Sequence, residues 1–101
     1  MKINFELFKV FYFAGKTLNY SEAAKELYVT QSAISQSIKQ LENEMETKLF
    51  IRHGKRMKLT PQGEILLVYV NKAYNNLLAG YRNITEYKDV TKGSIRIGAS
   101  D

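Results

Sequence analysis

Two helix start signals, separated by eleven residues, constrain the fold of this chain more than any other feature. Asn19, with Glu22 three residues later, has the pattern of a capping box, and Thr30 is a second N-cap. The first signal predicts a short helix over roughly 20–27, and the second predicts a longer helix that ends at about Met45. Because only a three-residue turn separates the two helices, the spacing predicts a helix-turn-helix.

The two faces of the longer helix differ in chemistry. Core positions at helical spacing are predicted on one side, at Ile34, Ile38, Leu41 and Met45. The other side carries Ser32, Ser35, Gln36 and Lys39, with Gln31 at the exposed N-terminal tip. Short hydroxyls and amides suit base edges in a major groove, and the free N–H groups of a helix start, here at the Thr30 cap, suit phosphate. A polar solvent-facing surface is the alternative, and this helix taken alone does not distinguish the two.

The segments before and after this unit complete the predicted domain. Residues 3–14 are rich in aromatics and predict a first helix that stops at Gly15. Its buried face would comprise Phe8, Phe11 and either Leu7 or Ala14. At the far end of the longer helix, Glu42, Glu44 and Glu46 are interpreted as a solvated helix end rather than an acid–base site.

A basic segment, residues 48–59, follows the helices. It holds five cations and no acid: Lys48, Arg52, Lys55, Arg56 and Lys58. His53-Gly54 resembles a tight turn, since both residue types tolerate positive φ, and flanking strands near 49–52 and 56–59 would form a small β-wing. Crowded cations in such a hairpin favour a phosphate partner, although a merely basic surface hairpin is the alternative. We interpret His53 as a wing-tip residue rather than a metal ligand.

A long helix is predicted from Pro61, capped by Thr60, to about Lys88. It carries two apolar stripes, one of which can pack on the domain's own core, while too little chain remains to cover the other. We therefore expect a homodimer seam on this helix, although burial of both stripes within the chain is the alternative. The expected dimer interface comprises Leu66, Val70, Ala73, Leu77, Tyr81 and Ile84.

Composition narrows the function classes. The net charge of +5 points weakly to a polyanionic partner, and the chain has one histidine and no cysteine. The chain therefore has few of the side chains that metal clusters and nucleophilic catalysis require. We expect no enzyme and no cofactor in this fragment. No apolar run reaches membrane-spanning length, so we expect no membrane association and a reducing cytoplasm as the location.

The alternating segment SIRIGA predicts a strand, and residues 91–101 are interpreted as the hinge and first strand of a further, effector-binding domain.

Three ordered segments carry a family resemblance that covers essentially the whole chain. They are EAAKELYVTQSAISQSIKQLE, LFIRHGKRMKLTPQG and, after the long helix, GSIRIGAS. Together they resemble the N-terminal region of LysR-type transcriptional regulators. The resemblance implies a mainly α fold: a winged helix-turn-helix of three helices plus a small β-hairpin wing over 1–60, followed by a dimerising linker helix over 61–90.

The resemblance also implies partners and contacts. It implies sequence-specific binding of double-stranded DNA, a homodimer that becomes a tetramer in the full-length protein, and a small-molecule co-inducer bound in an effector domain outside this fragment. The residues expected to contact DNA are Thr30, Gln31, Ser32, Ser35, Gln36, Lys39, Arg52, His53, Lys55 and Arg56. This chain departs from the family pattern at three places: Gln36 stands where many members carry arginine, Glu46 where a glycine is common, and Leu18-Asn19-Tyr20 where Gly-Ser-Phe is usual.

Two other functions remain open from the sequence. The chain could be a helical protein-interaction module with a degenerate winged helix, in which the basic wing is incidental. It could also belong to another winged-helix repressor subfamily that binds ligand inside the dimer. Salt-sensitive affinity for duplex DNA would favour the regulator, and indifference to DNA would favour the interaction module.

Overall fold

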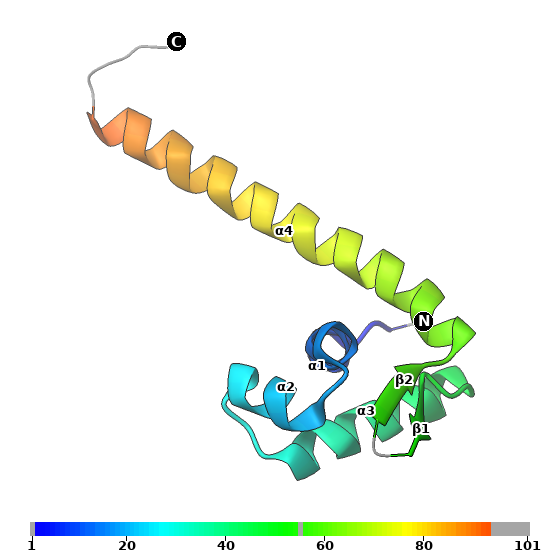
Figure 1. The fold of residues 1–101 in the computed structure, drawn as a ribbon. Coiled ribbons are helices and arrows are strands. Elements are labelled where there is room, and N and C mark those ends of the chain that lie inside the picture. Colours follow the sequence, from blue (N-terminus) through cyan, green and yellow to red (C-terminus); the bar gives the residue numbers. More distant parts are fainter. Residues whose placement is uncertain (1, 55, 94–101) are drawn as a thin grey trace. The chain divides into compact units, whose positions relative to one another are not determined.

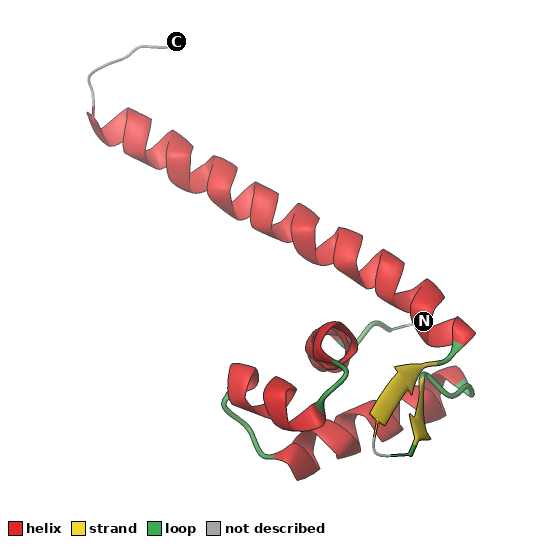
Figure 2. Cartoon of the chain, viewed as in Figure 1, coloured by secondary structure: helices red, strands yellow, loops and turns green. Residues whose placement is uncertain are grey.

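The computed structural model describes residues 2–54 and 56–93. Its elements, in chain order, are α1 (Phe5–Thr17), α2 (Tyr20–Leu27), α3 (Gln31–Met45), β1 (Phe50–His53), β2 (Arg56–Leu59) and α4 (Pro61–Gly93), as Figures 1 and 2 show. The strands pair antiparallel as a two-stranded wing. This arrangement confirms the predicted winged helix-turn-helix followed by a long helix. Contacts divide the chain into two units, Met1–Asn71 and Lys72–Asp101, so the first turns of α4 belong with the winged domain.

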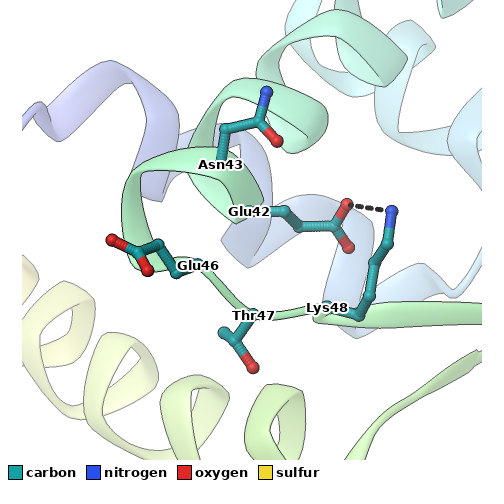
Figure 3. Close-up of a pocket in the computed structure, with 5 residues that line it drawn as sticks. All are labelled: Glu42, Asn43, Glu46, Thr47 and Lys48. Atoms are coloured by element: carbon teal, nitrogen blue, oxygen red, sulfur yellow. Dashed lines mark ion pairs between the residues drawn. The ribbon is translucent and has the colours of Figure 1, made fainter.

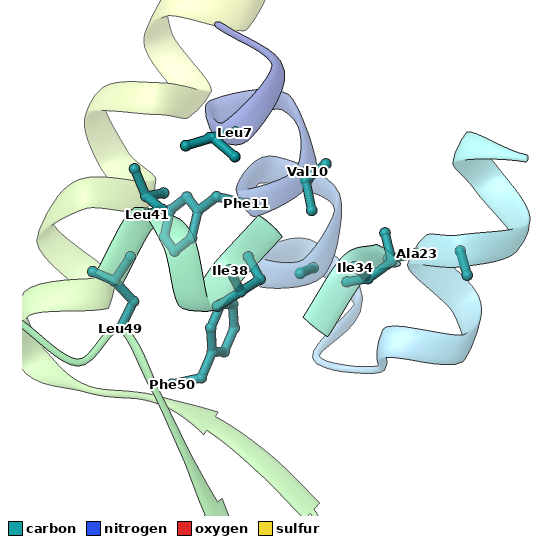
Figure 4. Packing of buried hydrophobic residues seen from close by; sticks show 11 residues of the cluster. Leu7, Val10, Phe11, Ala23, Ile34, Ile38, Leu41, Leu49 and Phe50 are labelled. Carbon is teal, nitrogen blue, oxygen red and sulfur yellow. The ribbon is translucent and has the colours of Figure 1, made fainter. Parts of the chain in front are cut away.

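The core of the winged domain joins α1, α2, α3 and the start of the wing (Figure 4). Four large side chains are almost fully enclosed: Phe11, Ile34, Leu41 and Leu49. The Phe11 ring lies 5.6 Å from the Phe50 ring, which ties the first helix to β1. Ala23 and Ala24 are both buried, and their small side chains let α2 approach its neighbours closely. The apolar pattern of α3 therefore serves the core, as predicted, except at Met45, which is 40% exposed in the last turn.

Each of the first three helices begins at a hydrogen-bonding side chain. Asn4, Asn19 and Thr30 all accept backbone N–H groups at the helix starts, as N-caps do. The predicted capping box is only half formed: the Asn19 side chain accepts from the Glu22 N–H, but the Asn19 N–H donates to Thr17 Oγ1. The local signals nevertheless placed both helices of the helix-turn-helix correctly.

The first three helices all end in left-handed residues that are not glycine. Leu18, Tyr28 and Glu46 have φ values of 53°, 57° and 54°. The predicted stop at Gly15 is therefore wrong, because α1 continues to Thr17. Gly15 is buried, and a Cβ built there would lie 3.0 Å from Leu67 Cδ1, so this glycine serves the packing of α1 against the start of α4.

The start of α4 is fastened to the start of the wing. Thr60 Oγ1 accepts the Gly63 N–H at 3.0 Å and donates to the Lys48 carbonyl at 2.7 Å. A Cβ at Gly63 would overlap the Leu49 carbonyl oxygen, so only glycine fits there. The helix continues to Gly93, five residues past the predicted end at Lys88. The strand expected beyond it lies outside the described residues.

Candidate nucleic-acid interface

One face of α3 is open and uncharged except for a single lysine. Ser32, Ser35, Gln36 and Lys39, which we call the polar face, are all exposed. On the opposite side, Ile34, Ile38 and Leu41 are at most 2% exposed. Burial of this apolar stripe fixes the rotation of α3 about its axis, so the polar face must point away from the core. It therefore forms a continuous row of hydrogen-bonding groups over about two helical turns.

The N-terminal tip of α3 is shaped by two side chains. Thr30 Oγ1 accepts the Ala33 N–H at 3.0 Å, so Thr30 caps the helix as predicted. Ser21, in the first turn of α2, donates its hydroxyl to Gln31 Oε1 at 2.9 Å. This second bond joins the two helices of the helix-turn-helix at their exposed side. Sequence reasoning missed it, because the partners are ten residues apart and neither belongs to a capping pattern.

The wing presents cations on both of its faces. In the strand register, Arg52 is opposite Met57 and His53 is opposite Arg56. Side chains alternate along a strand, so Arg52 shares the face of the buried Phe50, whereas His53 and Arg56 lie on the other face. His53 is thus the last residue of β1 and has no positive φ, which corrects the predicted His53-Gly54 turn. Of these two residues, Gly54 is the left-handed one, with φ 65°. Lys55, also expected at the interface, lies outside the described residues.

Glu42 has a structural role that the sequence interpretation missed. Its side chain is only 11% exposed, and Oε2 accepts the N–H groups of Leu49 at 2.8 Å and Phe50 at 3.2 Å. Its other oxygen pairs with Lys48 Nζ at 3.8 Å, at the rim of an open hollow that Asn43, Glu46 and Thr47 also line (Figure 3). Glu42 is therefore no solvated helix end: it is the acceptor that fixes the start of the wing to α3. Glu44 and Glu46 are exposed, as predicted.

Tyr20 adds a second link between the helix-turn-helix and the wing. Its ring meets the Phe50 ring edge-on, with 5.7 Å between centroids. Burial, with the Glu42 carboxylate as the second cause, raises the pKa of Tyr20 from 10.0 to about 12, and Arg52 opposes the rise. Glu42 and Arg52 therefore both lie within electrostatic reach of the Tyr20 hydroxyl, so α2, α3 and β1 converge at this tyrosine.

The predicted dimer interface falls into two parts. Leu66 and Val70 pack against the core of the winged domain, so one side of each is already occupied within the chain. Ala73, Leu77, Tyr81 and Ile84 are exposed, and the last three are 65% to 71% accessible. These four residues are the uncovered part of the stripe, and their place in a dimer stays a prediction.

Two features of the described residues bear on other functions. Across residues 2–54 and 56–93, no group of three or more His, Cys, Asp and Glu side chains is arranged to hold a metal ion. Over the same described part of the chain, no helix has both the length and the apolar character needed to cross a membrane.

Comparison with known proteins identifies the family of this chain. The family described as bacterial regulatory helix-turn-helix protein, lysR family, matches residues 5–64. The chain is 38% identical over 95 residues to the HTH-type transcriptional regulator HdfR of Yersinia pestis (strain Pestoides F). The matched region covers 94% of this chain and 32% of that relative. The chain thus spans about a third of the length of the curated relatives that it matches.

Two solved structures are similar in fold. The crystal structure of the BenM_DBD/catB site 1 DNA complex has a TM-score of 0.76 at 22% identity, covering 85% of this chain and 97% of that chain. The structure of Vibrio fischeri DarR in complex with DNA has a TM-score of 0.72 at 29% identity, covering 88% of this chain and 30% of that chain.

Proposed function

Because the chain belongs to the lysR family of bacterial regulatory helix-turn-helix proteins, we propose that it binds double-stranded DNA sequence-specifically as a dimer. In this proposal α3 enters the major groove and the wing contacts the backbone or the minor groove. The observation that carries it is the polar face of α3, which is exposed along its length although nothing in the core requires serines and glutamines there.

The chemistry of the polar face fits base edges better than it fits water alone. Ser35 and Gln36 offer both donors and acceptors on short side chains, as major-groove readout requires. Lys39 adds one cation at the position nearest the middle of the helix, where it can meet phosphate. The acids of α3 are confined to its last turns, and the Glu42 carboxylate among them accepts two N–H groups and lies 3.8 Å from Lys48 Nζ. Repulsion from a polyanion is therefore small at the end that would enter the groove.

The wing supplies the charge that the recognition helix lacks. Arg52, Arg56 and Lys58 are exposed, and no described carboxylate pairs with any of them. Cations left without partners in the free protein are available to displace counterions from DNA, which gives salt-dependent affinity. Such contacts set the position on the duplex and leave base discrimination to α3.

The primary test is selection of bound fragments from random DNA at near-physiological salt, followed by titration of the selected duplex. We expect one enriched motif and an affinity that falls as salt is added. Indifference to all duplex DNA, even in dilute buffer, would refute the proposal and favour a protein-interaction module.

Substitutions separate the two parts of the interface. Gln36→Ala should relax sequence preference and cost about 1–3 kcal/mol at a contacted base, whereas Arg52→Ala should weaken binding to all sequences and lower the salt slope by about one. Lys9→Ala removes a cation from α1 that is already paired with Glu6, and serves as the matched control that should change neither. An equal loss on operator and random DNA for Gln36→Ala would contradict its readout role.

For the dimer, the support is the uncovered stripe on α4. Three large apolar side chains, Leu77, Tyr81 and Ile84, face solvent in the free chain, and such a stripe is typical of a helical interface. Leu77→Glu should therefore shift the sedimenting species from dimer to monomer, while Glu86→Ala, on an exposed polar position, should not. A strict monomer of the unsubstituted protein at high concentration would count against the dimer.

The remaining proposals concern enzymatic activity, location, assembly and ligand. We infer a regulator of transcription without enzymatic activity of its own, acting on DNA in the bacterial cytoplasm. A tetramer and a small-molecule co-inducer, bound outside the described residues, stay predictions from the family.

A further inference from the structure

The hydrogen bond between Ser21 and Gln31 constrains a side chain that is placed to read DNA. Gln31 is the first residue of α3 and is exposed at its tip, and Ser21 reaches it from the first turn of α2. The Ser21 hydroxyl donates to Gln31 Oε1 across 2.9 Å. The backbones of both residues are already held in helices. The bond therefore restricts the side-chain torsions of Gln31.

The direction of the bond decides what Gln31 can offer to a base. A glutamine amide has an oxygen that accepts and an NH₂ group that donates. With Oε1 turned toward the Ser21 hydroxyl, the NH₂ group is the end left to face a ligand. By contrast, no hydrogen bond joins the Gln36 amide to another described residue, so Gln36 can turn either end outward.

Adenine and guanine differ in what they require of that amide. Adenine presents the N7 acceptor and the N6 donor, so a glutamine must use its oxygen and its NH₂ group together. Guanine presents two acceptors, N7 and O6, which an NH₂ group alone can meet. Resting on the proposed DNA binding, we propose that Ser21 is a specificity-determining positioning residue, which orients Gln31 as a donor and selects guanine over adenine at the base pair that Gln31 meets.

The test compares fragment selections by the unsubstituted protein and three variants. Gln31→Ala locates the base position, because the preference there should vanish. At that position the unsubstituted protein should enrich guanine over adenine. Ser21→Ala frees the amide to turn, so the guanine-to-adenine ratio should fall by about 2- to 10-fold, the range expected for losing one hydrogen bond. Ser21→Thr keeps the hydroxyl and should keep the ratio.

The outcomes separate this inference from the proposal beneath it. Ser21 is exposed, and the thermal unfolding of each variant shows whether the domain is intact. A clear motif whose ratio is unchanged in Ser21→Ala would overturn the role of Ser21 while leaving DNA binding in place. A motif untouched by Gln31→Ala would overturn it as well, because Gln31 would then read no base. Failure of the unsubstituted protein to enrich any sequence would refute DNA readout itself.

Discussion

Replacing Glu42 with alanine should destabilise the winged domain by about 3 kcal/mol. One carboxylate oxygen accepts the N–H groups of Leu49 and Phe50, two residues that are 0% and 7% exposed. Hydrogen bonds to a charged group contribute about 1.5–3 kcal/mol each, and the two bonds share a single oxygen, so the lower values apply to the pair. The ion pair adds little, because Lys48 is 73% exposed and such pairs contribute about 0–1 kcal/mol.

Urea unfolding followed by circular dichroism measures this effect, with every variant at the same protomer concentration because dimerisation would couple stability to concentration. Glu42→Gln keeps an oxygen for the two N–H groups but loses the charge, and should lose about half as much. Glu44→Ala, two residues away and hydrogen-bonded among the described residues only to exposed Gln40, should stay within about 0.5 kcal/mol of the unsubstituted protein. If Glu42→Ala unfolds together with Glu44→Ala at equal m-value, the wing is not held by this carboxylate.

Three further perturbations test other features of the fold by the same unfolding measurement. Gly63→Ala places a Cβ onto the Leu49 carbonyl oxygen and should cost about 1–3 kcal/mol, whereas Gly80→Ala, with nothing within 4 Å, should gain up to about 1 kcal/mol. Equal effects of the two would contradict the close approach. Glu46→Gly relieves a left-handed residue at φ 54° and should gain about 0.5–1 kcal/mol; a loss would show that this backbone is not strained. Since the pKa of Tyr20 is raised to about 12, the folded state favours the neutral phenol, and this contribution is complete below pH 10 and lost as pH rises from 10 to 12. Tyr20→Phe should lack this part of the alkaline loss, and an unchanged pH profile would rule out the buried phenol as its source.

Local signals explain why the helices could be predicted from sequence. Asn19 and Thr30 each accept the N–H group three residues further along the chain, so their effect depends on the adjacent chain and not on the fold. Thr60 likewise accepts the Gly63 N–H three residues further along, and Pro61 follows it as the first residue of α4. The polar face of α3 was predicted for a similar reason, because helical periodicity assigns each residue to a side once the apolar stripe is known.

The end of α1 was harder to predict than its start, because it depends on long-range packing. Glycine often ends helices, yet α1 continues through Gly15. Here the glycine leaves room for Leu67, which packs where a side chain would otherwise lie. The chain turns only at Leu18, in a left-handed conformation that leucine rarely adopts. Strain of this kind is tolerated when the surrounding core determines the path of the chain, and no local pattern announces it.

The amino-acid sequence by itself determined the order of the elements, the wing and the polar face, because caps and periodicity act over a few neighbouring residues. Only the tertiary structure decided the roles of Glu42, Tyr20 and Ser21. Glu42 meets its partners seven and eight residues away, and Ser21 meets Gln31 ten residues away. The sequence alone does not distinguish a polar side chain that faces water from one that binds a distant backbone N–H group. The partner is fixed only when the helices and the wing pack together.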